Sequence, residues 1–151
     1  MKQISLHVAT EADMEAFGGR FVSALGNLKL VTLNGPLGAG KTTFVRGLLR
    51  ALGHAGAVKS PTFTLVEPYE MNGRRFYHFD LYRLKDPEEL EFLGIRDYLA
   101  GPDLCVVEWA ERAKGLLPAP DVAVMIAPAN NGRSVTVTAH TPRGEAWLSG
   151  F

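Results

Sequence analysis

Two largely apolar stretches predict strands that are buried on both faces of a sheet. One is Leu28–Leu33, and the other covers residues 104–107, which read Leu-Cys-Val-Val. Apolar, β-branched runs of this length are typical of parallel strands covered by helices. Glu108 follows the second run directly. It therefore lies at the carboxyl end of a strand, the edge of an open α/β sheet that faces the ligand.

Elsewhere, apolar and polar residues alternate with the period of a half-buried strand. This holds for residues 4–8, and for 122–126 and 135–137 on either side of an Asn131-Gly132 turn signal. The last two segments predict an antiparallel hairpin that extends the sheet toward the C-terminus. Asn72-Gly73 predicts a second hairpin, whose returning strand covers residues 75–82. On that strand Phe76, His78 and Asp80 share one face.

Helical periodicity marks two longer segments, each with one apolar face. The first follows Thr10, a predicted N-cap, and the second ends at Gly53. Their inward-facing residues are Met14, Phe17, Phe21 and Leu25 in the first and Phe44, Leu48, Leu49 and Leu52 in the second. A shorter helix is predicted at Asp86-Pro87-Glu88-Glu89, with Asp86 as N-cap, Pro87 at the first helical position and Glu89 completing a capping box.

Composition and charge narrow the functional classes. The 151 residues suit one domain, 1–151, with a substantial core. Lys+Arg and Asp+Glu both number 16, and no run of like charge stands out, so a broad nucleic-acid-binding surface is excluded. Cys105 is the one cysteine and lies in an apolar run, which indicates a core residue in a reducing compartment. With no signal peptide and no membrane span predicted, we expect a cytoplasmic protein.

The strongest chemical motif stands between the first buried strand and the second helix. Residues 35–42 match G-x-x-x-x-G-K-[ST], the phosphate-binding P-loop. Glycines allow the backbone to curl around an anion, Lys41 supplies a charge between the β- and γ-phosphates, and the Thr42 hydroxyl coordinates Mg²⁺. The predicted nucleotide-binding residues are Gly35, Pro36, Leu37, Gly38, Ala39, Gly40, Lys41, Thr42 and Thr43.

The surroundings of this motif decide between nucleotide binding and a glycine-rich turn that matches by chance. A strand, the loop and a helix follow one another in the required order. The sequence therefore predicts an α/β protein with a P-loop NTPase-like fold. This is a mostly parallel sheet flanked by helices, with antiparallel strands toward the C-terminus.

Four residues downstream are candidates for the rest of such a site. Ser60 and Thr62 lie in a loop that either senses the γ-phosphate and Mg²⁺ or only leads into a strand. Asp80 ends its strand and either binds Mg²⁺ or forms a structural ion pair, for example with Arg83. Glu108 suits the Mg²⁺ hydration shell or the attacking water. Beyond these, Trp109 either stacks, lines a partner surface or packs.

Taken together, these motifs resemble the bacterial TsaE (YjeE) family of small P-loop ATPases, which are needed to make threonylcarbamoyladenosine in tRNA. The resemblance is carried by residues 34–43, Ser60-Pro61-Thr62-Phe63, residues 78–83 (His-Phe-Asp-Leu-Tyr-Arg) and Val107-Glu108-Trp109. These motifs occur in the family's order and cover nearly the whole chain. Ala110 stands where the family pattern suggests proline.

The resemblance implies ATP and Mg²⁺ as ligands. It implies Thr42 and Glu108 as Mg²⁺ residues, Asp80 as a support of the active site or a further metal residue, and Ser60, Thr62 and Trp109 as residues needed for activity. It also implies nucleotide contacts from Glu11, from Glu111 or Arg112, and from Arg133. The implied partners are the TsaD and TsaB subunits of a threonylcarbamoyl-transfer complex, with tRNA contacted indirectly.

We therefore expect ATP hydrolysis that resets or activates a partner complex. Turnover by the chain alone should be slow, because no water-orienting Gln and no arginine finger are identifiable. One alternative is a nucleotide or small-molecule kinase, which would need a lid and an acceptor pocket. Another is a nucleotide-gated binding module in which hydrolysis is incidental. A GTPase is disfavoured because the chain has no N-K-x-D motif.

Overall fold

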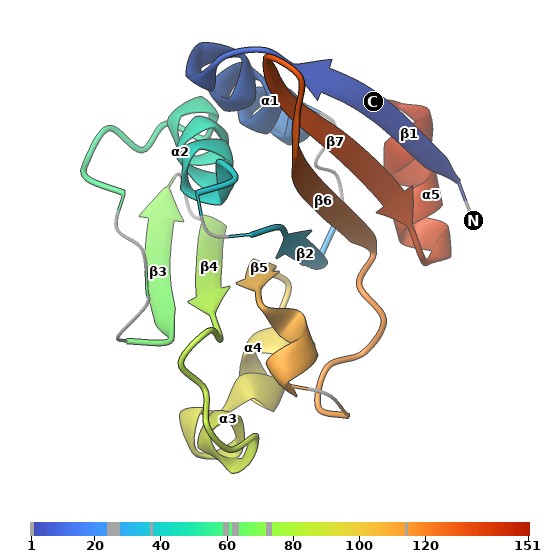
Figure 1. Cartoon of the computed structure of the whole chain (residues 1–151). Helices are drawn as coiled ribbons and strands as arrows, with labels where there is room; N and C mark the ends of the chain where they lie inside the picture. Colours follow the sequence, from blue (N-terminus) through green and yellow to red (C-terminus); the bar gives the residue numbers. More distant parts are fainter. Residues whose placement is uncertain are drawn as a thin grey trace.

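The structure is a computed structural model that describes residues 2–23, 28–36, 38–58, 61, 64–71, 74–113 and 115–151. Within these residues the strands form one sheet of seven in the order β1-β7-β6-β2-β5-β4-β3 (Figure 1). The strands are β1 Gln3–Val8, β2 Leu30–Asn34, β3 Val66–Met71, β4 Arg74–Asp80, β5 Leu104–Glu108, β6 Val122–Ala129 and β7 Gly132–Ala139. The helices are α1 Glu11–Ser23, α2 Lys41–Ala51, α3 Glu88–Leu93, α4 Ile95–Ala100 and α5 Pro142–Ser149, with the short 3₁₀ helix η1 Ala110–Ala113.

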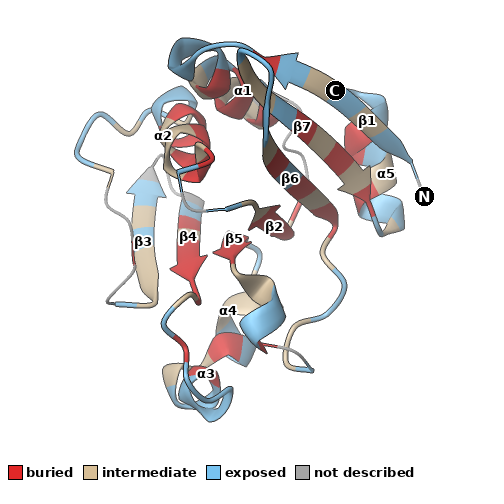
Figure 2. Cartoon of the chain, in the orientation of Figure 1, coloured by how far each residue is buried: buried red, intermediate tan, exposed pale blue. Residues whose placement is uncertain are grey.

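The centre of the sheet is parallel, as the apolar runs predict. β2 pairs in parallel with both β5 and β6, and β4 pairs in parallel with β5. Every residue of β5 is buried, and most of β2 and β4 is as well (Figure 2). In register, Glu108 lies opposite both Leu33 of β2 and Asp80 of β4. The carboxyl ends of these three strands therefore meet where the P-loop leaves β2.

Antiparallel strands complete both edges of the sheet. β6 and β7 form the predicted C-terminal hairpin, in which Asn131 takes a positive φ of 57°, and β1 pairs with β7. β3 and β4 form the other predicted hairpin, although its Asn72-Gly73 turn lies outside the described residues. The predicted mixed sheet is thus confirmed, with antiparallel strands at both edges and not only toward the C-terminus.

Helices cover the two faces of the sheet over separate cores. α1 and α2 pack so closely that a Cβ at Gly47 would lie 2.0 Å from Glu15 O and one at Gly18 would lie 2.2 Å from Phe44 O. With α5, they enclose an aromatic cluster in which Phe21 contacts Trp147 at a ring-centroid distance of 4.3 Å. The C-terminal aromatic residues therefore dock on the core. α3 and α4 cover the other face and pack with β4 and β5.

Two local predictions are refined by the structure. The predicted capping box is present, since Glu88 N donates to Asp86 Oδ1 (3.0 Å) and Asp86 N donates to Glu89 Oε2 (3.1 Å). The helix itself begins at Glu88, one residue later than predicted, so Pro87 lies just before it.

Cys105 is fully buried, and burial raises the pKa of its thiol to about 12. It is therefore a neutral core residue, as predicted.

Asp121 ties the start of β2 to the start of α5. Its buried carboxylate accepts hydrogen bonds from Lys29 N (2.9 Å), Leu30 N (3.2 Å) and the N-cap hydroxyl of Thr141 (2.7 Å). Burial raises the pKa of Asp121, but these hydrogen bonds and the nearby charge of Arg143 outweigh burial, so the pKa is lowered overall. The carboxylate form is therefore the one that stabilises the fold.

We expect Asp121→Asn to lower the free energy of unfolding by about 1–3 kcal/mol at neutral pH. Because the native pKa is depressed, the carboxylate contributes stability above its ordinary pKa of about 3.9, and this is lost as pH falls through the native pKa. Urea unfolding should therefore show a difference from wild type that shrinks below about pH 4. Asp97→Asn, at an exposed position, is the control. A difference for Asp121→Asn that stays constant with pH would contradict this assignment.

Candidate active site

The P-loop has the backbone conformation that its glycines predict. Gly35, Gly38 and Gly40 have φ values of 153°, 79° and 109°, which L-residues with side chains rarely adopt. A Cβ at Gly35 would lie 2.5 Å from Ile126 O of the neighbouring β6. Leu37 lies outside the described residues. The loop therefore leads from β2 into α2 along a path that only glycine permits at these positions.

Lys41 is buried at the end of this loop, with an exposed fraction of 6 %. Its Nζ donates a hydrogen bond to Gly35 O (2.8 Å) and lies 3.5 Å from Glu108 Oε1. The same ammonium lies 4.5 Å from the centre of the Trp109 ring. The loop carbonyl, the carboxylate and the indole face together stabilise a cation that would otherwise be costly to bury.

Trp109 has an unusual backbone. Its φ is 58°, in a region that residues with side chains seldom occupy. Besides contacting Lys41, its ring lies 5.0 Å from that of Tyr82. Non-glycine residues in such conformations concentrate at functional sites. Of the roles left open from the sequence, packing is the one that the structure displays, since Trp109 packs half-buried against the core cluster of β4 and β5 and its ring is tilted by 55° to that of Tyr82.

Two buried carboxylates lie in register at the carboxyl ends of β4 and β5, and one of them, that of Glu108, contacts Lys41. Glu108 is 4 % exposed, and its Oε2 lies 2.6 Å from Nε2 of His78. Asp80, in register opposite Glu108, is 6 % exposed, and its Oδ1 accepts a hydrogen bond from Tyr82 N (3.0 Å). The structure therefore brings Lys41 into contact with Glu108, and places Asp80 on the strand next to Glu108. His78 also belongs to this group. The alternation along β4 predicts that His78 shares a face with Asp80, but it does not predict the contact with Glu108.

The structure describes only some of the remaining motif residues. Thr42 and Thr43 lie in the first turn of α2, half-buried. Ser60 and Thr62 lie outside the described residues, so their predicted role in phosphate sensing stays a prediction. Among the described residues, no three His, Cys, Asp or Glu side chains cluster as a metal site. The oxygen groups near the loop are Thr42, Asp80 and Glu108, which are hard donors of the kind Mg²⁺ prefers when substrate phosphates complete its shell.

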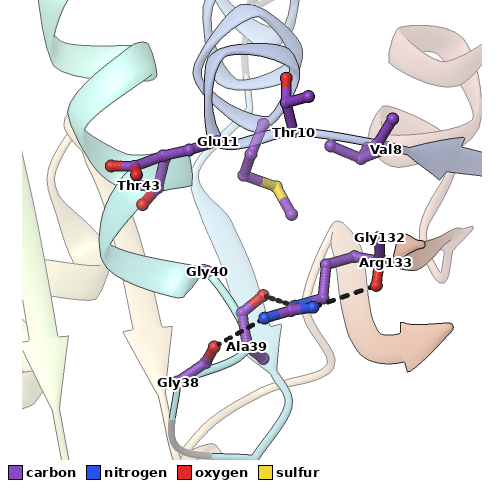
Figure 3. A pocket seen from close by; sticks show the side chains of 11 residues that line it. Val8, Thr10, Glu11, Gly38, Ala39, Gly40, Thr43, Gly132 and Arg133 are labelled. Atoms are coloured by element: carbon purple, nitrogen blue, oxygen red, sulfur yellow. Dashed lines mark hydrogen bonds between the residues drawn. The ribbon is translucent and has the colours of Figure 1, made fainter. Parts of the chain in front are cut away.

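A cavity of about 350 Å³ lies beside the P-loop, and its walls come from distant parts of the chain. Figure 3 shows Glu11 and Thr10 at the start of α1 on one side, and Gly132 and Arg133 of β7 on another. Arg133 donates to Ala39 O (3.0 Å) and Gly38 O (3.3 Å), so it also fixes the loop. Glu11 and Arg133, both predicted nucleotide contacts, are thus brought together beside Thr43.

A second cavity, of about 400 Å³, opens on Lys41 and Trp109. Glu111 of η1 lines it together with Met125, a half-exposed residue of β6. Arg112 lies instead against the Tyr82 ring, at 5.5 Å from its centre. Of the two alternatives for a nucleotide contact in this segment, Glu111 is therefore the one that faces a cavity next to the P-loop.

Comparisons of the sequence with known proteins find one family. A family model described as "Threonylcarbamoyl adenosine biosynthesis protein TsaE" matches residues 8–135. A curated relative from Haemophilus influenzae, "tRNA threonylcarbamoyladenosine biosynthesis protein TsaE", is 46% identical over 156 residues and covers 100% of this chain and 99% of its own. A relative of the same name from Bacillus subtilis is 36% identical, covering 92% of this chain and 87% of its own.

A solved structure is similar along almost the whole chain. The crystal structure of Bacillus subtilis YdiB superposes with a TM-score of 0.83 at 29% sequence identity, covering 99% of this chain and 93% of that one. In the described part of the chain, no helix is long and apolar enough to cross a membrane.

The Lys41–Glu108 contact can be tested without any ligand. Lys41→Met and Glu108→Gln each leave the partner buried with a weaker counterpart, so we expect the double variant to be less destabilised than the sum of the singles. The coupling energy from denaturant unfolding should be about 1–3 kcal/mol. The exposed pair Arg96–Glu91, with a nitrogen–oxygen distance of 2.9 Å, is the matched control and should couple by less than about 1 kcal/mol. Strictly additive single variants at Lys41 and Glu108 would refute the contact.

Proposed function

The chain belongs to the TsaE family, and from this premise we propose that it is a Mg²⁺-dependent ATPase of tRNA threonylcarbamoyladenosine biosynthesis. It hydrolyses ATP to reset or activate a threonylcarbamoyl-transfer complex. The observation that carries the proposal is the meeting of Lys41 with Glu108 at the carboxyl end of the parallel strands. This is the edge at which α/β proteins of this type bind their ligands.

ATP binding changes the partners of Lys41. In the structure its ammonium is held by Gly35 O and Glu108. A triphosphate in the loop offers several anionic oxygens, and the ammonium turns to the β- and γ-phosphates while the amino end of α2 faces the same charge. Arg133 donates hydrogen bonds from its guanidinium to the loop carbonyls of Gly38 and Ala39, and so keeps these oxygens turned away from the anion. The loop amides remain available for the phosphates.

Thr42 and Glu108 would hold Mg²⁺, with Asp80, in register opposite Glu108, in support, because their oxygens are donors of the kind that Mg²⁺ prefers. The metal would neutralise charge on the phosphate oxygens of ATP. Because Glu108 contacts Lys41, the residue that would bind the γ-phosphate, its carboxylate also suits the orientation of an attacking water.

The described residues supply few groups for the transition state itself. Arg133 is engaged with the loop backbone, and the Arg112 guanidinium lies against Tyr82. Neither is placed as an arginine finger at the γ-phosphate end. Slow turnover by the chain alone follows, with acceleration when TsaD and TsaB subunits complete the site. The formal net charge of zero favours indirect contact with tRNA through these partners.

A nucleotide-gated binding module is the second candidate, since nucleotide binding alone would already displace Lys41 from Glu108. Glu108→Ala separates the two. If hydrolysis disappears while ATP binding and tRNA modification persist, the chain acts as a module. If modification is lost together with hydrolysis, it acts as an ATPase. Analysis of the products for a phosphorylated metabolite tests the kinase alternative in the same reactions.

Reconstituted tRNA modification tests the proposal as a whole. We expect threonylcarbamoyladenosine formation by a TsaD–TsaB complex over repeated turnovers to require this chain. The Lys41→Ala variant should not support this formation. ATP hydrolysis should rise at least about tenfold when the complex is added, because the missing catalytic groups come from the partner. Equal hydrolysis rates with and without the complex, or modification that never depends on the chain, would contradict the proposal.

A further inference from the structure

His78 is a buried histidine on β4, between β5 and the edge strand β3. It has an exposed fraction of 0 % and follows the face-sharing pattern of Phe76 and Asp80. Its Nε2 lies 2.6 Å from Glu108 Oε2, across the parallel pairing of β4 and β5. A carboxylate only accepts hydrogen bonds, so Nε2 carries the hydrogen and His78 is the donor.

The other ring nitrogen is left without a hydrogen bond. In the part of the chain that the structure describes, Nδ1 of His78 is a buried side-chain nitrogen with no hydrogen-bond partner. Burying an unsatisfied polar atom costs free energy, which an apolar residue of similar size would avoid. Packing alone therefore does not account for histidine at this position. The contact made by Nε2 is what distinguishes it from a phenylalanine or leucine.

That contact determines how Glu108 presents its two oxygens. Oε2 is held by His78, and Oε1 lies 3.5 Å from Lys41 Nζ. The terminal torsion of a glutamate is otherwise broad, so a carboxylate without the imidazole would rotate. With Oε2 fixed, the plane of the carboxylate is fixed as well, and Oε1 alone faces the P-loop.

We propose that His78 is a positioning residue that fixes Glu108 so that one carboxylate oxygen is presented to the ligand side of the P-loop. Given the proposed function, on which this step rests, Oε1 becomes available to Mg²⁺ or to a metal-bound water when Lys41 moves to the phosphates. Outer partners of this kind orient ligating carboxylates, and their loss typically costs about 10–100-fold in metal affinity or activity.

The test measures how much Mg²⁺ tightens ATP binding. The dissociation constant for ATP is determined with Mg²⁺ and with EDTA for wild type, His78→Leu, His78→Gln and Phe76→Leu. We expect His78→Leu to reduce the Mg²⁺-dependent gain in affinity by about tenfold or more while leaving affinity in EDTA nearly unchanged. His78→Gln, whose amide nitrogen can replace Nε2 as donor, should recover most of the gain. Phe76→Leu, a packing change at a buried neighbour on the same face, should lower stability and leave the gain intact.

An equal loss of affinity for ATP with Mg²⁺ and with EDTA in His78→Leu, or the same Mg²⁺-dependent gain in all four proteins, would overturn the proposal.

If wild type itself binds no ATP, the proposed function fails, and the imidazole of His78 is then examined without nucleotide. Nitrogen-15 spectra of the ligand-free protein should show the His78 hydrogen on Nε2 and none on Nδ1, with an Nε2 resonance that moves in Glu108→Ala. A hydrogen on Nδ1, or an Nε2 resonance indifferent to Glu108→Ala, would overturn the positioning role even there.

Discussion

The structure depends on satisfying one buried cation, the ammonium of Lys41. It lies at the junction of β2, α2 and β5, where its exposed fraction is only 6 %. An isolated charge cannot remain there, so Gly35 O, Glu108 and the Trp109 ring surround it. Glu108 in turn needs a second donor for its other oxygen, and His78 provides it. These residues form one row of contacts from β4 to the P-loop, and a phosphate ligand would enter it by competing for Lys41.

The P-loop is held in shape from its other side as well. Arg133 reaches from β7 to the carbonyls of Gly38 and Ala39, and the tight passage of Gly35 past Ile126 O fixes where the loop leaves β2. The sheet order makes this possible, because β6 lies beside β2 on the side opposite β5, and β7 follows β6. The described part of the loop is therefore held by the fold itself, through Arg133 and the packing at Gly35.

Short-range patterns carried most of what the sequence could predict. The apolar runs of β2 and β5, the Asn131-Gly132 hairpin and the capping box at Asp86 and Glu89 each depend on residues close together in the chain, and the structure confirms them. The P-loop conformation follows from glycine spacing in the same way. Glu108 could be placed at the site because the carboxyl end of a parallel strand has a known position relative to the loop.

Features that depend on strand order and register could not be found in this way. The pairing of β1 with β7 brings Glu11 and Arg133 to one cavity, and only the family resemblance indicated both. The contact between His78 and Glu108 requires the register of β4 against β5, which no local pattern specifies. Fluorescence of Trp109, in a Trp147→Phe variant that leaves it as the one tryptophan, tests the central claim most directly. Adding ATP should change the emission of Trp109 as Lys41 leaves the ring, with saturation at one ATP per chain, and Lys41→Met should abolish this change. An unchanged emission in a protein that calorimetry shows to bind ATP would contradict the account. A full emission change in Lys41→Met would contradict it as well.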